Sequence, residues 1–131
     1  MDDDLLAEWD KHRSRFGLTW LTKIMTAKRL RKVGVDPDTA AQVDTVLRSA
    51  LAASDPSAYE ARAKDAHLIC VAIDHRAAIV SMDKKARNGY RSFCTSSPPW
   101  REVDYFCLPD HDADLATWCT SPAHPAPPIC S

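Results

Sequence analysis

The stretch that decides the fold is residues 64–87, which read KDAHLICVAIDHRAAIVSMDKKAR. Apolar residues recur at helical spacing after Asp65, and this periodicity predicts a helix over about 65–75. A short apolar run over 77–82 then predicts a buried strand that ends at Asp83. A helix followed by a buried strand is typical of an α/β fold with a parallel sheet.

The geometry of such a unit brings its two aspartates to one edge of the sheet. A helix of about ten residues descends about 15 Å, and a strand of five or six residues climbs back about 17–20 Å. Ligands of open α/β sheets bind at that edge, and paired carboxylates suit Mg²⁺ or Mn²⁺. The alternative is structural: Asp65 favours a helix dipole and Asp83 caps the next helix.

The rest of the chain predicts more helices than strands. Further helices are expected over 5–16, 19–33, 38–53 and 84–93, with a helical turn over 59–62 and a last strand over 103–108. Residues 1–108 are therefore expected to form one domain. Residues 109–131 hold five of the nine prolines, which predicts a loosely packed or disordered tail with a helical turn near 114–119.

Composition sets further limits. The 131 residues are 45% hydrophobic and 27% charged, with a formal net charge of −1, so the totals do not indicate nucleic-acid or membrane binding. No apolar run could span a bilayer, and the acidic start MDDDLLAEWD is unlike a signal peptide, which predicts a cytoplasmic protein. Five cysteines without a CxxC pair argue against a disulfide framework, and a scattered Cys/His zinc site stays open as an alternative.

Three segments together resemble a known family. The stretch 64–87 resembles the later half of PIN domains, in which one aspartate opens a helix and a second follows an apolar strand. Residues 5–16, LLAEWDKHRSRF, resemble the helix that carries the family's glutamate, here Glu8, and VDYFCLP resembles the last strand. The resemblance implies a three-layer α/β/α fold with a parallel sheet. It also implies a toxin-type endoribonuclease that depends on Mg²⁺ or Mn²⁺, with RNA, a small antitoxin and a second copy as partners.

The chain departs from the family at its start. PIN domains begin with an apolar strand that ends in the first metal-binding aspartate, and no such strand precedes Leu5. The sheet is therefore expected to be incomplete at the N-terminus, and its two predicted strands are too few for a parallel sheet between helix layers. The chain is interpreted as a fragment, as a degenerate relative, or as a protein whose missing strand comes from a partner chain.

The resemblance assigns a role to each candidate residue. Glu8, Asp65 and Asp83 would be the catalytic and metal-binding carboxylates, with the metal stabilising charge on the scissile phosphate. His12 and Ser81 are accessory candidates, although Glu8 and His12 also suit an ordinary helical pair and Ser81 could simply finish its strand. Residues 11–32 hold eight basic residues and no acid, which suits either RNA phosphates or a solvated helix face. The RNA-binding candidates are Lys11, Arg13, Arg15, Lys28, Arg29, Arg31 and Lys32. A non-catalytic PIN remnant that binds protein or nucleic acid is the second hypothesis.

Overall fold

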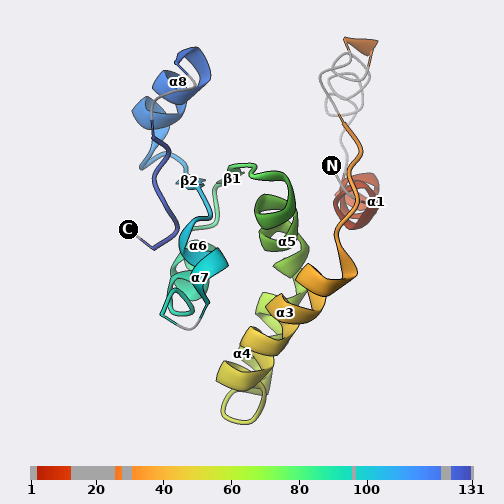
Figure 1. The fold of residues 1–131 in the computed structure, drawn as a ribbon. Coiled ribbons are helices and arrows are strands. Elements are labelled where there is room, and N and C mark those ends of the chain that lie inside the picture. The colour runs from red at the N-terminus through yellow and green to blue at the C-terminus, as the bar shows by residue number, and fades with distance from the viewer. Residues whose placement is uncertain (1–2, 13–25, 28–30, 96, 122–124, 131) are drawn as a thin grey trace. The chain divides into compact units, whose positions relative to one another are not determined.

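The computed structural model describes residues 3–12, 26–27, 31–95, 97–121 and 125–130 (Figure 1). The chain divides into two compact units, residues 1–35 and residues 36–131. Within the described residues, no helix combines the length and the apolar character that a membrane crossing requires.

The first unit contains helix α1 (Asp3–His12), which has two acidic residues in its first turn, where they favour the helix dipole. The helix predicted over 5–16 therefore begins earlier than expected. The helix predicted over 19–33 falls mostly on residues outside the described ones. An ion pair of 2.5 Å between Lys32 and Asp3 links the two ends of this unit.

The second unit begins with a group of helices that pack on one another. They are α3 (Pro37–Leu47), its π-helical extension η1 (Arg48–Ala52), α4 (Pro56–Lys64) and α5 (Ala66–His75). Asp36 and Asp55 cap α3 and α4 by accepting hydrogen bonds from backbone N–H groups of the first turn, and proline follows each cap. Leu47 and Ile69 are fully buried where α3 and α5 meet. The expected turn over 59–62 is thus a full helix, although α4 has no buried residue to reveal it in the sequence.

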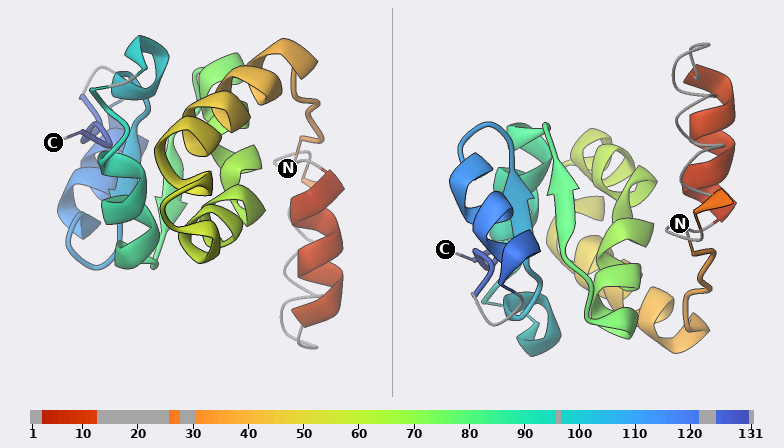
Figure 2. Two further views of the ribbon diagram at one scale, coloured as in Figure 1. Left: turned by 90° about the horizontal axis from the view of Figure 1, so that it is seen from below. Right: turned by 90° about the horizontal axis from the view of Figure 1, so that it is seen from above.

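The sheet consists of two parallel strands, β1 (Ile79–Ser81) and β2 (Tyr105–Cys107), which lie side by side in Figure 2. Val80 pairs with Phe106 at the centre of the register. Helices α6 (Lys84–Arg91) and α7 (Pro98–Arg101) make the crossover between the strands. The mixed helix and strand architecture agrees with the predicted α/β class, and α5 packs on β1 while α6 packs on β2.

The C-terminal residues correct the prediction of a loosely packed tail. Helix α8 (Asp112–Thr120) contacts β2, and residues 125–130 form a segment that we call the strap. The strap runs antiparallel to β2, with Tyr105 N donating to Pro127 O at 2.8 Å and Ile129 N donating to Val103 O at 2.7 Å. Proline lacks an N–H but keeps its carbonyl, so a proline-rich segment can still accept hydrogen bonds from a sheet edge.

Two further contacts fasten the strap. Ile129 is fully buried, and Arg87 donates a hydrogen bond of 3.0 Å to the carbonyl of Pro128. Cys130 forms a disulfide with Cys94, across a Cα–Cα distance of 5.8 Å. The sequence argued against a disulfide framework and did not predict this pair, which forms because the strap folds back over 36 residues to meet the loop after α6.

Candidate functional site

Asp65 occupies the junction of two helices. It is both the C-cap of α4 and the N-cap of α5, yet its side chain makes no capping hydrogen bond. The structural alternative for this residue, a favourable charge at the helix dipole, needs no such bond and agrees with its position at the start of α5. The half-buried carboxylate is left available at the start of α5.

Asp83 follows β1 and begins α6. One carboxylate oxygen accepts a hydrogen bond of 2.8 Å from Ala86 N, which is the cap that the structural alternative predicted. The backbone N–H of Asp83 donates to the hydroxyl of Ser81 at 2.9 Å. These two bonds orient Asp83, and no hydrogen bond to its second oxygen occurs within the described residues. Ser81 thus holds the turn that positions Asp83.

Two buried tyrosines lie on the elements that follow Asp83 in the chain. The side chains of Tyr90, on α6, and Tyr105, on β2, are almost completely buried. Burial raises the pKa of both phenols, and the negative charges of Asp65 and Asp83 raise both pKa values further. A hydrogen bond with Ser81 acts in the opposite direction on the pKa of Tyr105. Ser81 therefore contacts both the Tyr105 phenol and the backbone of Asp83, which places this phenol beside the turn after β1.

A positive side chain adjoins the same tyrosine. The guanidinium of Arg62 lies against Gly89 of α6 so closely that a Cβ at that position would overlap it. It also lies 5.9 Å from the centre of the Tyr90 ring, and the Tyr90 hydroxyl donates to the Arg62 carbonyl at 2.8 Å. Arg62 and the two tyrosines were not among the predicted site residues. The sequence signal that could have indicated one of them is Tyr105, a tyrosine inside the apolar strand VDYFCL.

The other predicted site residues lie in the first unit or outside the described residues. Glu8 lies on α1 and forms an ion pair of 3.6 Å with Lys11, and Lys32 pairs with Asp3, so two predicted RNA-binding cations contact acids. Arg31 is exposed. One accessory candidate and four basic candidates have side chains outside the described residues. They are His12, Arg13, Arg15, Lys28 and Arg29.

The described residues offer few side chains that could hold a metal ion together. Among the described residues, no group of three or more His, Cys, Asp and Glu side chains is placed to hold a metal ion. This also leaves the zinc alternative without a ligand cluster in that part of the chain. Asp65 and Asp83 nevertheless keep oxygens free of capping bonds, and Mg²⁺ can bind through one or two carboxylates while it retains water. Each of these two residues therefore retains a carboxylate oxygen of the kind that suits a hydrated divalent ion.

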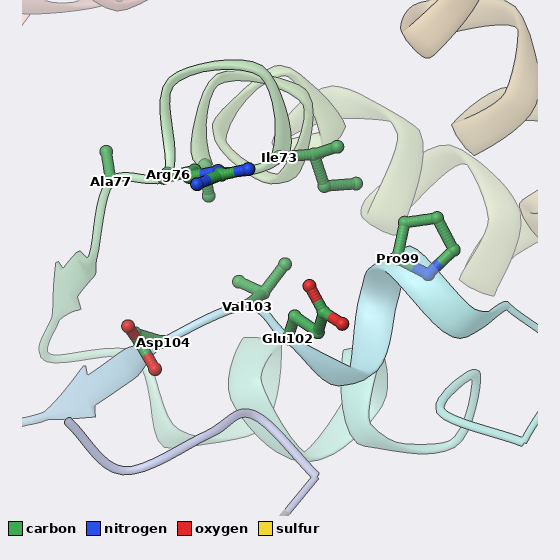
Figure 3. Close-up of a pocket in the computed structure, with 8 residues that line it drawn as sticks. Ile73, Arg76, Ala77, Pro99, Glu102, Val103 and Asp104 are labelled. Atoms are coloured by element: carbon green, nitrogen blue, oxygen red, sulfur yellow. The ribbon is translucent and has the colours of Figure 1, made fainter. Parts of the chain in front are cut away.

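A cavity of about 580 Å³ lies at the opposite end of the strands (Figure 3). It is formed by the end of α5, by α7 and by the residues that precede β2. None of the predicted site residues lines it. The lining residues are Ala72, Ile73, Arg76, Ala77, Pro99, Glu102, Val103 and Asp104.

A comparison with protein-family models gave no match, and comparisons with curated proteins and with solved structures gave none either.

Proposed function

We propose that this chain is a PIN-type, metal-dependent endoribonuclease domain with a three-layer α/β/α fold. The observation that carries the proposal is the placement of Asp65 at the start of α5 and of Asp83 at the carboxyl end of β1, in a parallel strand pair. This is the edge at which ligands bind in open α/β sheets. The proposed catalytic and metal-binding carboxylates of the second unit are Asp65 and Asp83, and Glu8 of the first unit is proposed on the resemblance alone.

The residues around the aspartates have distinct tasks in this proposal. Hydrogen bonds with Ser81 and Ala86 hold Asp83 in place. The Asp65 carboxylate makes no capping hydrogen bond and is available to a ligand. A bound Mg²⁺ or Mn²⁺ would stabilise negative charge on the phosphate under attack. Arg62 supplies a cation beside Tyr90, and in this proposal it would contact a neighbouring phosphate of the RNA.

Exposed apolar side chains at the end of β1 support the proposal of an incomplete sheet. Val80 is 49% exposed and Met82 is 81% exposed, and they are the exposed large hydrophobic residues of the described chain. Parallel sheets are normally covered on both faces, so among the described residues one surface at the end of β1 lacks its usual cover. In the proposal a partner chain supplies the missing strand. We also propose a small antitoxin and a second copy of the chain as partners, and a cytoplasmic location.

The second hypothesis is a non-catalytic PIN remnant that binds protein or nucleic acid. Two observations favour it. The described residues contain no group of three metal-binding side chains, and they form a sheet of only two strands. A remnant would bind RNA through its basic residues without cleaving it.

Cleavage of a single-stranded RNA with Mn²⁺, and with EDTA in its place, separates the two hypotheses. We expect metal-dependent cleavage by the unmodified chain, which Asp65→Asn and Asp83→Asn each abolish. Asp55→Asn is the matched control, because Asp55 also caps a helix but lies at the far end of α4 from Asp65. RNA binding without cleavage would support the remnant, and equal cleavage by all variants would refute the proposed site.

A further inference from the structure

The cavity at the amino end of the strands has two facing walls of different charge. Figure 3 shows Arg76 and Ile73 on the α5 wall, and Glu102, Val103 and Asp104 on the wall that leads into β2. The guanidinium thus belongs to one wall and two carboxylates belong to the other. Ile73 and Val103 supply apolar surface between them, and the volume of about 580 Å³ lies within the range of small-molecule sites.

Arg76 is held in an unusual backbone conformation. It ends α5 with φ 49° and ψ 44°, in the left-handed region. Among the described residues, no other non-glycine residue has a positive φ. Glycine normally fills this position after a helix, because a Cβ makes the conformation unfavourable. The chain therefore carries an arginine where a glycine would be more stable, and the arginine side chain lines the cavity.

The three charged groups do not neutralise one another. Among the described residues, Arg76, Glu102 and Asp104 form no ion pair, and their side chains make no hydrogen bond. Burial raises the pKa of the Asp104 carboxyl, as expected for a carboxylate that lacks a positive partner. Unpaired charges of opposite sign on facing walls are complementary to a ligand that carries both charges.

We propose that this cavity binds a small zwitterion with an apolar body, of the kind represented by an amino acid with an apolar side chain. The ligand carboxylate contacts the guanidinium of Arg76, and the ligand ammonium contacts Glu102 and Asp104. The apolar body packs on Ile73, Val103 and Pro99. This site is separate from the proposed nuclease site, because Arg76 ends α5 and Asp65 begins it, about 15 Å apart along the helix.

The test is a calorimetric titration of the full chain with three related compounds. L-phenylalanine carries both charges, L-phenylalaninamide lacks the carboxylate, and 3-phenylpropionate lacks the ammonium. We expect L-phenylalanine to bind, and each of the other two to bind about tenfold more weakly or not at all, since each loses a charge-assisted contact. Equal binding of either analogue, or no binding by L-phenylalanine, would overturn the proposal.

Arg76→Gly is the decisive variant, because it removes the guanidinium and also relieves the left-handed backbone. We expect its melting temperature to equal or exceed that of the unmodified chain, while its affinity for L-phenylalanine falls at least tenfold. The control is Arg91→Ala, which removes an exposed arginine of α6 that does not line the cavity. Unchanged affinity in Arg76→Gly, or an equal loss in Arg91→Ala, would contradict the assignment.

Discussion

The disulfide between Cys94 and Cys130 gives a quantitative prediction about stability. Reduction, or the substitution Cys130→Ala, removes a crosslink that encloses 36 residues. The loop-closure entropy of such a crosslink is about 13 cal/mol/K, or about 3.8 kcal/mol of unfolding free energy at 25 °C. This contribution is expected because the strap is part of the core, with Ile129 fully buried and backbone hydrogen bonds that join Pro127 to Tyr105 and Ile129 to Val103.

The assay is urea unfolding with and without reductant. With a slope of about 2 kcal/mol/M, the loss of about 3.8 kcal/mol lowers the midpoint by about 2 M. In Cys130→Ala the reductant should have no further effect. The control is Cys119→Ala, which removes an exposed free thiol and should leave the midpoint and its response to reductant unchanged.

Counting thiols tests the pairing independently. The unreduced chain, denatured so that buried thiols react, should titrate three free cysteines: Cys70, Cys107 and Cys119. After reduction all five cysteines should react. Five reactive thiols before reduction, or a midpoint that reductant does not move, would refute the docked strap.

Two other predictions concern the site around Tyr90. Its folded-state pKa lies above the ordinary value of 10.0, so the unfolded chain loses this proton first. Stability should therefore be fully present below about pH 10 and fall as the pH rises further, and urea midpoints at pH 9 and 11 should differ less in Tyr90→Phe. Gly89→Ala should raise stability by about 1 kcal/mol in an Arg62→Ala background but by less in the unmodified chain, where the guanidinium occupies the space of the new Cβ. Equal gains in both backgrounds, measured by urea unfolding, would show that Arg62 does not lie against Gly89.

Local patterns in the sequence predicted the central part of the fold. The helix expected over 65–75 is α5, the strand expected over 77–82 contains β1, and the strand expected over 103–108 contains β2. The positions of Asp65 and Asp83 follow from the same local rules, since one begins a helix and the other follows a strand. Such features depend on residues near one another in the chain, so periodicity and capping preferences reveal them.

The tertiary structure alone decided the features that join distant segments. The strap pairs with β2 because its carbonyls and Ile129 reach an open strand edge, and a proline-rich composition does not disclose that contact. The partner of Cys130 depends on a Cα–Cα distance of 5.8 Å across 36 residues, which spacing in the chain cannot reveal. The burial of Tyr90 and Tyr105, and the facing charges of the cavity, likewise arise only when separate elements pack together. The sequence by itself determined the central helix, the two strands after it and the carboxylates at their ends, because those are local properties of the chain. Packing decided what surrounds those carboxylates.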